Sequence, residues 1–404
     1  MTGDPIERKT IVLGVTGSIA CYKAADLASK LTQAGASVEV ILTAGARQFL
    51  TPLTFRSLTH RPVVADLFDP DSELAVQHVA LAERAHLVVV APATANVIAK
   101  LAVGLADDAL TATILATRAP VMVAPAMDAH MYENPAVQEN LQRLRQRGMI
   151  IVGPAKGRLA SGLYGLGRLV EVELLLGHIR LLLGRNGDLA GRTVVVSAGG
   201  TQEPVDPVRV VTNRSSGKMG YALAEAARDR GARAILVTAP TALPDPVGVE
   251  AVHVETAVQM REAILRAIAG ADVLIMAAAV ADYMPVSMAP QKVKKGPETW
   301  TLQLTRTPDI LKEADGNIIK VGFAAESENL LANARDKLLS KGLHLIVAND
   351  ITAPESGFGV DTNKVALLER DGGVEELPLM GKYQVAHRIL DRVARLLAGR
   401  PRAI

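Results

Sequence analysis

The sequence predicts an α/β protein built from two doubly wound, Rossmann-like domains. The chain has 404 residues, which is longer than one hydrophobic core usually serves. It is rich in Ala, Val, Leu and Gly, and only 3% of its residues are aromatic. Short apolar runs alternate with segments of helical periodicity, which is typical of buried parallel strands covered by helices.

The apolar runs give the expected strands. In the first half they lie at Thr10–Val15, Ser37–Leu42, Leu87–Ala91, Pro120–Ala124 and Met149–Val152. In the second half they lie at Thr193–Ser197, Arg233–Val237, Asp272–Ala277, Lys320–Ala324, Leu343–Ala348 and Lys364–Leu368. A helical stretch near Val172 to Leu183 gives way to a polar, glycine-rich segment. We therefore expect a first domain over residues 1–184, a linker over 185–191 and a second domain over 192–404.

Charge and cysteine content limit the class of protein. The net charge of +2, from 44 basic and 42 acidic residues, gives no electrostatic reason to expect nucleic acid or a membrane as a partner. The single cysteine, Cys21, excludes an intramolecular disulfide framework. No run approaches the ~20 apolar residues needed to span a bilayer, and the polar N-terminus lacks the apolar core of a secretory signal. We expect a cytoplasmic protein.

The segment Asn213–Gly220 is the most informative motif. It follows an apolar strand that ends in glycines, and it places Ser215, Ser216, Gly217 and Lys218 ahead of a helical pattern at Tyr221–Arg228. A helix N-terminus with unpaired N–H groups favours a phosphate. The pattern is neither a Walker A sequence nor Gly-x-Gly-x-x-Gly, so a tight turn that caps the helix is an equal alternative.

Two loops after buried strands predict a pocket in the first domain. Gly17 and Ser18 follow the first strand, and the loop Pro92–Asn96 follows the strand at Leu87–Ala91. The carboxyl ends of such strands are where doubly wound sheets bind ligands. His78 lies on an amphipathic helical pattern, where a histidine is more often structural than catalytic.

Two further segments are candidates for substrate contact. Pro125–Tyr132 mixes methionines with polar residues and follows a buried strand, so it is either a substrate clamp or core filling. The segment Gly157–Arg168 has glycines at positions 157, 162, 165 and 167. It predicts either a mobile lid or an unstructured surface loop, and the local sequence favours the loop.

Acidic and basic residues near strand ends in the second domain suit a nucleoside triphosphate with a divalent cation. Asp282 ends an apolar strand, and Lys292-Val-Lys-Lys295 lies on the next loop. Lys337 and Lys341 are four residues apart and share one helix face. A solvated charge run is the alternative for both lysine groups.

Taken together, these motifs resemble a known pair of enzyme families. Gly17–Lys23, His78, Ala91–Asn96 and Pro125–Tyr132, in this order, resemble the flavin-dependent cysteine decarboxylases. The second half resembles the phosphopantothenate–cysteine ligase domain. The chain thus resembles the bifunctional family of coenzyme A biosynthesis, in which CTP-dependent ligation of cysteine to 4′-phosphopantothenate precedes FMN-dependent decarboxylation to 4′-phosphopantetheine.

For the first domain, the resemblance implies a flavodoxin-like flavoprotein with His78 as the catalytic histidine. The cysteine thiol of the substrate is oxidised so that CO2 can leave, and the electrons are then returned. The implied FMN-binding residues are Gly17, Ser18, Ile19, Thr43, Pro92, Ala93, Thr94, Ala95 and Asn96. The implied substrate clamp is Met127, Asp128, Met131 and Arg168.

Three departures from the family pattern lie in the clamp and the glycine-rich segment. Asp128 replaces an asparagine and Tyr132 replaces a tryptophan. Many members carry Cys-Gly-Asp, with the cysteine as proton donor, where this chain has Ser161-Gly162-Leu163. An ionised Asp128 repels a substrate carboxylate unless its pKa is raised or it pairs with a cation. A serine hydroxyl is a much weaker acid than a thiol, so we expect Ser161 to be a poor proton donor.

For the second domain, the resemblance implies that CTP converts the carboxylate of 4′-phosphopantothenate into an acyl-cytidylate, which the cysteine amine attacks. The residues implied for catalysis are Asn213, Arg209 and Lys292. The implied CTP-binding residues are Ala277, Ala278, Asp282, Lys292, Pro308, Asp309, Ile310, Phe323, Lys337 and Lys341, beside the phosphate loop Ser215–Lys218. Mg2+ is expected to bind mainly through the CTP phosphates.

The resemblance also implies a homo-oligomer, with trimeric flavin domains and dimeric ligase domains in a dodecamer. Two other interpretations stay open at this point. An active ligase could carry a flavin domain that only binds flavin or completes part of the reaction, which Asp128, Ser161 and Leu163 motivate. An NAD(P)-dependent oxidoreductase is the third interpretation, and the missing Gly-x-Gly-x-x-Gly weakens it.

Overall fold

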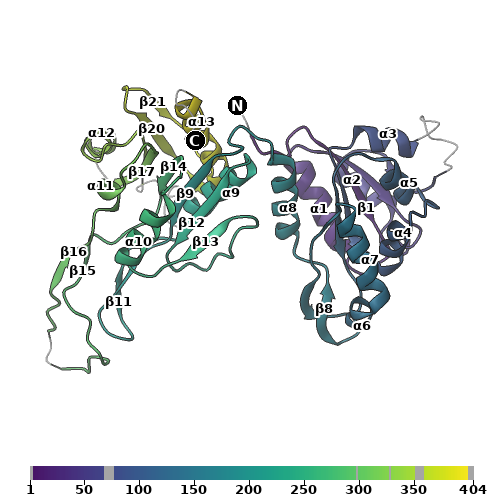
Figure 1. Ribbon diagram of the computed structural model, residues 1–404, viewed down its shortest axis with the longest axis horizontal. Coiled ribbons are helices and arrows are strands. Elements are labelled where there is room, and N and C mark those ends of the chain that lie inside the picture. Colours follow the sequence, from purple (N-terminus) through teal and green to yellow (C-terminus); the bar gives the residue numbers. More distant parts are fainter. Residues whose placement is uncertain (1–2, 68–76, 297–298, 327–328, 351–358, 399–404) are drawn as a thin grey trace. The chain divides into compact units, whose positions relative to one another are not determined.

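The computed structural model describes residues 3–67, 77–296, 299–326, 329–350 and 359–398. The chain forms two compact units. The N-terminal unit comprises Pro5–Leu183, and the C-terminal unit comprises the chain from Gly184 onward together with the first residues described. Each unit has its own sheet (Figure 1).

The N-terminal unit contains a six-stranded parallel sheet in the order β3-β2-β1-β4-β5-β6. The strands are β1 (Thr10–Val15), β2 (Ser37–Leu42), β3 (Val63–Val64), β4 (Leu87–Ala93), β5 (Val121–Pro125) and β6 (Ile150–Ile151). This is the Rossmann order, and without the two-residue β3 the remaining five strands have the flavodoxin order. The predicted fold class is confirmed.

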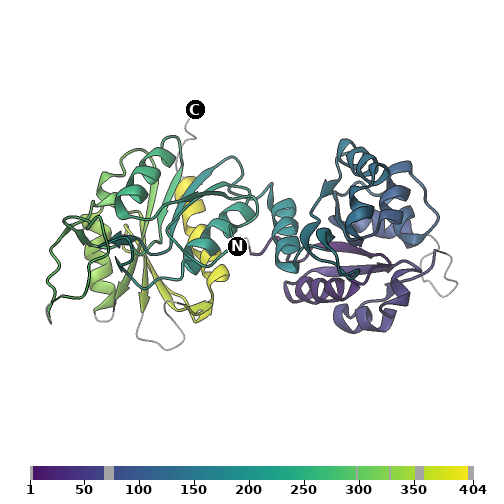
Figure 2. The same ribbon diagram turned by 90° about the horizontal axis from the view of Figure 1, so that it is seen from below.

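Helices cover both faces of this sheet (Figure 2). They are α1 (Cys21–Gln33), α2 (Pro52–Thr59), α3 (Gln77–Arg84), α4 (Ala95–Val103), α5 (Ala109–Ala116), α6 (Ala129–Glu133), α7 (Pro135–Gln146) and α8 (Val172–Gly184), with a short 3-10 turn at Ala46–Gln48. One core includes Leu13 with Leu27 of α1 and Ile179 of α8. The opposite core includes Val12 with Ile98 of α4, because successive side chains of a strand point to opposite faces.

The C-terminal unit contains an eight-stranded sheet in the order β13-β12-β9-β14-β17-β18-β20-β21. The strands are β9 (Thr193–Ala198), β12 (Arg233–Thr238), β13 (Glu250–His253), β14 (Val273–Met276), β17 (Ile319–Glu326), β18 (Leu345–Asp350), β20 (Val365–Glu369) and β21 (Val374–Glu376). The strands from β13 to β18 are parallel, again in the Rossmann order. β20 and β21 add an antiparallel edge.

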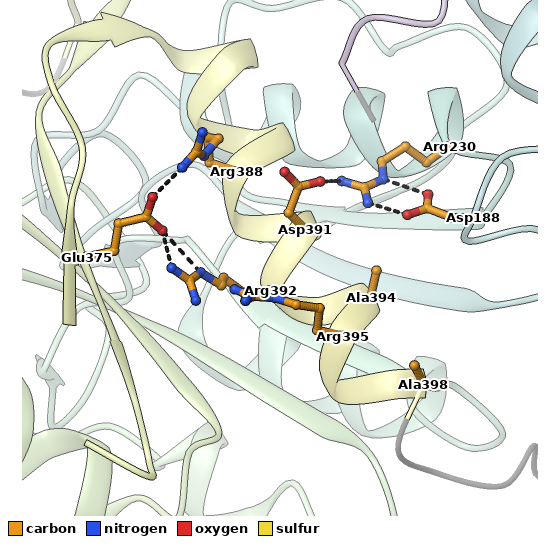
Figure 3. A pocket seen from close by; sticks show the side chains of 9 residues that line it. All are labelled: Asp188, Arg230, Glu375, Arg388, Asp391, Arg392, Ala394, Arg395 and Ala398. Atoms are coloured by element: carbon orange, nitrogen blue, oxygen red, sulfur yellow. Dashed lines mark hydrogen bonds and ion pairs between the residues drawn. The ribbon is translucent and has the colours of Figure 1, made fainter. Parts of the chain in front are cut away.

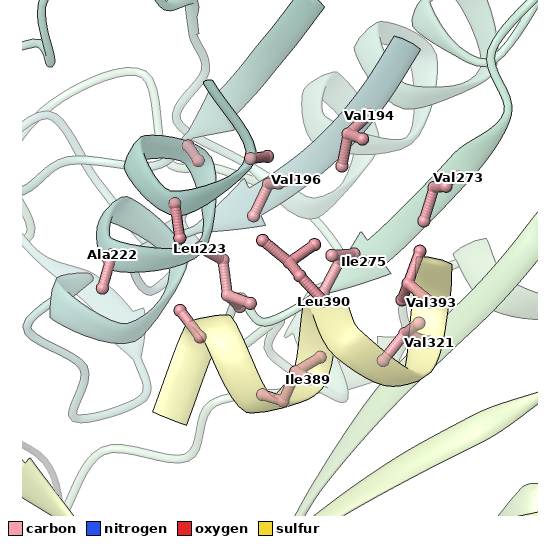
Figure 4. Packing of buried hydrophobic residues seen from close by; sticks show 14 of the residues in the cluster. Val194, Val196, Ala222, Leu223, Val273, Ile275, Val321, Ile389, Leu390 and Val393 are labelled. Carbon is pink, nitrogen blue, oxygen red and sulfur yellow. The ribbon is translucent and has the colours of Figure 1, made fainter. Parts of the chain in front are cut away.

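The helices of the C-terminal unit are α9 (Lys218–Asp229), α10 (Ala257–Ala267), α11 (Ile310–Glu313), α12 (Leu330–Ser340) and α13 (Lys382–Ala398). α9 and α13 pack together on one face of the sheet, and Figure 4 shows Leu223, Ile389 and Leu390 among the valines of the strands. The described part of the unit also contains the two-stranded ribbons β10 (Gln202–Pro204) with β11 (Val210–Thr212), β15 (Tyr283–Pro285) with β16 (Leu304–Arg306), and β19 (Thr362–Asn363) with β22 (Met380–Gly381).

The segment expected as a linker packs on the C-terminal unit. Leu189 is fully buried in its core, and its backbone N–H donates to the carbonyl of Arg230 at 3.0 Å. A β-carbon at Gly187 would lie 2.5 Å from that same carbonyl oxygen, so only glycine fits there. Residues 185–191 are therefore packed against this unit.

Candidate functional site

A cavity of about 510 Å3 opens at the carboxyl ends of β1, β4 and β5 in the N-terminal unit. Of the residues predicted for flavin and substrate binding, those that line it are Gly17, Ser18, Ile19, Thr94, Ala95, Met127, Asp128, Met131, Ser161 and Arg168. The lining also includes residues that we did not predict as site residues, namely Ala20, Tyr22, Lys23, Ala126, Arg158, Leu159, Ala160, Gly167 and Leu169.

Thr16 joins the two loops that start this cavity. Its fully buried hydroxyl donates to the carbonyl of Pro92 at 2.7 Å and accepts from the backbone N–H of Thr94 at 2.9 Å. Gly17 then passes close to Gly45, where a β-carbon would come within 2.9 Å of the backbone. Sequence reasoning found Gly17 but missed Thr16, because a single threonine at a strand end has no distinctive signal.

The start of α1 lies at the same edge. The hydroxyl of Ser18 accepts from the backbone N–H of Ala20 at 3.3 Å, and no acidic residue lies in the first turn of the helix. An anion at this end is favoured by the helix dipole and the N–H groups. The cavity therefore fits a flavin phosphate at α1 and an apolar ring against side chains such as Ile19, Met127 and Leu169.

The glycine-rich segment is an ordered hairpin, so our expectation of an unstructured loop is wrong. β7 (Ala155–Arg158) pairs antiparallel with β8 (Tyr164–Arg168). The backbone N–H of Met127 donates to the carbonyl of Gly167 at 2.9 Å. The glycines allow this close approach, since a β-carbon at Gly165 would lie 2.8 Å from that of Ala129.

Lys23 anchors the chain just beyond the hairpin. Its buried ammonium donates to the carbonyl of Leu169 at 3.1 Å and pairs with Glu171 at 2.9 Å. Arg168 pairs with the other oxygen of Glu171 at 3.2 Å. These contacts hold the side chain of Arg168 in the lining of the cavity.

Asp128 and Ser161 are in direct contact across the cavity wall. The Ser161 hydroxyl donates to Oδ2 of Asp128 at 2.6 Å, and the backbone N–H of His130 donates to Oδ1 at 3.1 Å. The Ser161 hydrogen bond and that from His130 hold the pKa of Asp128 below its usual range. We considered a raised pKa as one of two ways in which Asp128 could tolerate a substrate carboxylate. The structure excludes this way, because the pKa of Asp128 is lowered.

Other predicted residues of this domain do not line the cavity. Thr43 lies near the backbone of Val15, with its hydroxyl 3.4 Å from that carbonyl. Pro92 and Ala93 end β4 and Asn96 lies in the first turn of α4, and all three are absent from the lining. His78 is half-buried on α3, which packs against α5. A single copy of the chain thus does not bring His78 into the cavity lining.

In the C-terminal unit, hydrogen bonds bring Asn213 to the end of β14. The Asn213 amide donates to the carbonyl of Val280 at 3.1 Å. Thr201, which follows β9, accepts from the backbone N–H of Ala281 at 2.9 Å through its fully buried hydroxyl. Ala278 donates its N–H to the hydroxyl of Ser197 at 3.1 Å. Asn213 and the segment Ala277–Asp282 therefore lie together, beyond the carboxyl ends of the neighbouring strands β9 and β14, where the strand order reverses.

The predicted phosphate loop leads into α9 through Gly217, whose φ of 76° favours glycine. The hydroxyl of Ser215 accepts from the N–H of Gly217 at 3.3 Å. Lys218 pairs with Asp361 at 2.7 Å and donates to the carbonyl of Gly359 at 2.7 Å. In this structure its ammonium is thus held by protein oxygens.

A second group of predicted CTP contacts surrounds Asp309. Asp309 caps the short α11 and forms an ion pair with Lys341. Lys337 donates to the carbonyl of Phe323 at 2.8 Å. The backbone N–H of Thr307 donates to the carbonyl of Asp282 at 3.0 Å, which joins this group to the end of β14. Pro308 and Ile310 flank Asp309 in the chain.

Arg209 contacts the loop that carries Lys292. The Arg209 guanidinium donates to the carbonyl of Val293 at 3.2 Å and lies 5.5 Å from the ring centre of Trp300. Lys292 is exposed to solvent. The contact through Val293 places the lysine-rich loop next to Arg209.

A second cavity, of about 590 Å3, lies along α13 away from these residues (Figure 3). Its guanidinium groups are paired with carboxylates: Arg230 with Asp188 at 2.5 Å and with Asp391 at 2.9 Å, and Arg388 and Arg392 with Glu375. Such mutual pairing is typical of a structural ion-pair network. We assign it no ligand.

The described residues contain neither a cluster of metal ligands nor a membrane-spanning helix. In that part of the chain no group of three or more His, Cys, Asp and Glu side chains could hold a metal ion. The described helices also include none long and apolar enough to cross a membrane.

Comparison with known proteins covers both units. A family model described as "DNA/pantothenate metabolism flavoprotein C-terminal domain" matches residues 189–397, and one described as "Flavoprotein" matches residues 2–183. "Coenzyme A biosynthesis bifunctional protein CoaBC" of Bacillus subtilis (strain 168) is 47% identical over 397 residues, which are 97% of this chain and 98% of that protein. The protein of the same name from Mycobacterium tuberculosis (strain H37Rv) is 45% identical over 410 residues, with 97% of each chain covered.

Two of the similar solved structures each cover about half of this chain. The crystal structure of the C-terminal domain of a protein named CoaBC has 41% identity and a TM-score of 0.46, and covers 53% of this chain and 100% of its own. A mutant PPC decarboxylase complexed with pantothenoylaminoethenethiol has 32% identity and a TM-score of 0.40, and covers 43% of this chain and 98% of its own. The near-full-length relatives decide the assignment: the chain belongs to the family of bifunctional coenzyme A biosynthesis proteins.

Proposed function

We propose that the C-terminal unit uses CTP to ligate cysteine to 4′-phosphopantothenate, and that the N-terminal unit decarboxylates the product with bound FMN to give 4′-phosphopantetheine. The observation that carries this proposal is that 47% identity to a bifunctional relative extends over 97% of the chain, and therefore over both units. This favours two activities over a flavin domain that only binds its cofactor.

In the N-terminal unit, Ser18 and the start of α1 are proposed to hold the FMN phosphate, with Thr94 and Ala95 on the other loop. When bound, FMN supplies a reversible two-electron oxidation of the substrate thiol. We propose that Arg168 is the cation that binds the substrate carboxylate, because the ionised Asp128 repels that carboxylate. The hydroxyl of Ser161 donates its hydrogen bond to Asp128. The proton that the family's cysteine supplies is therefore proposed to come from a different group or from water.

In the C-terminal unit, Asn213 is proposed to bind the acyl-cytidylate oxygen, and Arg209 and Lys292 to neutralise charge on the phosphates. The group around Asp309, including Lys337 and Lys341, is proposed to bind the nucleotide. Mg2+ is proposed to bind mainly through the CTP phosphates, where it improves the leaving group. Lys218 must leave Asp361 before it can contact a phosphate, because its ammonium is paired there.

We propose trimeric flavin domains and dimeric ligase domains in a dodecamer, in the cytoplasm. Exposed apolar side chains support association. In the ligase unit they include Val208, Tyr283, Val286 and Trp300 on or beside the two ribbons β10–β11 and β15–β16. A trimer also offers a source for the missing histidine, since His78 of one copy can complete the cavity of the next.

Cofactor and assembly can be tested on the purified full chain. Mass spectrometry of the released flavin should identify FMN, and light scattering should give the mass of a dodecamer. Mixing two inactive variants, His78→Asn and Ser18→Trp, should restore decarboxylation if neighbouring copies share a site. No recovery after exchange of subunits, in a mixture proven to contain mixed oligomers, contradicts the shared site.

A further inference from the structure

Asp206 lies in the turn between β10 and β11, and its side chain is fully shielded from solvent. The residues that follow it in the turn, Pro207, Val208 and Arg209, are exposed, whereas Val205 before it is buried. Oδ1 accepts from the backbone N–H of Val208 and of Arg209, both at 2.8 Å. Oδ2 accepts from the backbone N–H of Val293 at 3.1 Å, and Val293 belongs to a different loop.

The turn holds that second loop at three points. Besides the Asp206 bond, the backbone N–H of Ala289 donates to the carbonyl of Val205 at 2.9 Å, and Arg209 donates to the carbonyl of Val293 at 3.2 Å. The peptide groups of Val293 are therefore bound on both their N–H and their C=O side. Lys292 precedes this fixed residue in the chain, so its backbone position is set while its side chain stays free.

The charge of Asp206 suits this role. Burial by itself raises the pKa of Asp206, but the hydrogen bonds from Val208, Val293 and Arg209 and the nearby guanidinium outweigh it, and the pKa lies below its usual range. Asp206 also pairs with the Arg209 guanidinium at 3.3 Å. An ionised acceptor makes stronger hydrogen bonds to N–H groups than a neutral one.

We propose that Asp206 is a positioning residue for the ligase reaction, whose carboxylate holds Val293 so that Lys292 and Arg209 face one bound nucleotide. The inference rests on the proposed roles of Lys292 and Arg209. The side chain of Asp206 is buried within the turn, so it does not itself contact substrate. It acts by holding together two loops from different parts of the sequence, so that the backbone that carries the cations is already ordered when CTP binds.

The test is Asp206→Asn in the full chain, with Glu203→Gln as the matched control. Glu203 is another buried carboxylate of the same ribbon, and it accepts from the backbone N–H of Ala257 at 2.9 Å. It therefore reproduces the loss of a buried charge without touching the lysine loop. CMP formation is measured against CTP, 4′-phosphopantothenate and cysteine in turn, and decarboxylation is measured with supplied 4′-phosphopantothenoylcysteine.

We expect Asp206→Asn to lower kcat/KM for CTP about 10- to 100-fold, as for a displaced reacting group, and to leave KM for cysteine and decarboxylation unchanged. The loss should be smaller in a Lys292→Ala background, because one of the two positioned cations is then absent. Glu203→Gln should keep the parent kcat/KM for CTP even if its melting temperature falls.

Two results overturn the inference and differ from each other. If Lys292→Ala is impaired but Asp206→Asn matches the Glu203→Gln control, the positioning role is wrong and the proposed ligase site stands. If Lys292→Ala retains full ligation, the proposed role of Lys292 is wrong, and the inference about Asp206 fails with it.

Discussion

Gly167→Ala tests how the hairpin β7–β8 closes the flavin cavity. A β-carbon at Gly167 would overlap the carbonyl oxygen of Met127, well inside the 3.0 Å that real β-carbons keep, and would lie 3.3 Å from the backbone of Asp128. The neighbour is backbone, not a flexible side-chain end, so it cannot turn away. The hairpin and the Met127–Asp128 segment must therefore separate.

The size of the effect follows from this overlap. Relief needs a displacement of about 1 Å, and a misplacement of that size can cost about 100-fold in rate. The bond from Met127 to the Gly167 carbonyl, at 2.9 Å, lengthens with it. We expect decarboxylation to fall by about 10- to 100-fold and the N-terminal unit to lose about 1–3 kcal/mol of stability from overpacking.

The assay is decarboxylation of supplied 4′-phosphopantothenoylcysteine at saturating flavin, followed by mass spectrometry, with thermal melting in parallel. Gly157→Ala is the control in the same hairpin, since its added β-carbon would meet only the Arg168 side chain, at 3.4 Å. Ligation in the C-terminal unit should be unchanged in both variants. If Gly167→Ala decarboxylates as fast as Gly157→Ala, close packing of the hairpin does not shape this site.

Four further predictions concern other parts of the chain. His78→Asn should abolish CO2 release with ligation intact, and Asn213→Ala should do the reverse; unchanged product from either purified variant refutes that residue's role. Arg230→Met, which removes a buried guanidinium paired with two carboxylates, should destabilise the C-terminal unit by about 3–5 kcal/mol, visible as a lower melting temperature. A hydrogen bond from Arg392 lowers the pKa of Glu375 from its ordinary 4.5. The contribution of ionised Glu375 to stability is therefore complete above pH 4.5 and is lost as the pH falls through the lowered pKa. Glu375→Gln should reduce the loss of stability at acid pH, and an unchanged loss contradicts this.

The sheets could be predicted because their strands are continuous apolar runs. The expected strand Thr193–Ser197 differs from β9 by one residue, and Thr10–Val15 matches β1. Their parallel pairing follows from the helices between them. The antiparallel edge formed by β20 and β21 was not expected. Because β21 is only three residues long, the sequence does not show whether a tight turn or a helical crossover follows β20.

The hairpin β7–β8 could not be predicted from its own residues. Its glycines are typical of a loop, and their use becomes clear only against the backbone of Met127 and the β-carbon of Ala129, which lie in another part of the chain. Thr16 was missed because a single threonine at a strand end has no distinctive signal. Asp206 had a signal, since Asp before Pro starts many turns, but its bond to Val293 joins segments 87 residues apart.

The most direct test of the whole account is one reaction followed to its end. Purified protein is given 4′-phosphopantothenate, cysteine, CTP and Mg2+, and mass spectrometry follows CMP, 4′-phosphopantothenoylcysteine and 4′-phosphopantetheine together. We expect CMP and 4′-phosphopantetheine to accumulate in equal amounts, although Ser161 replaces the family's cysteine. CMP with a reaction that stops at 4′-phosphopantothenoylcysteine or at an oxidised enethiol would contradict the proposed second activity.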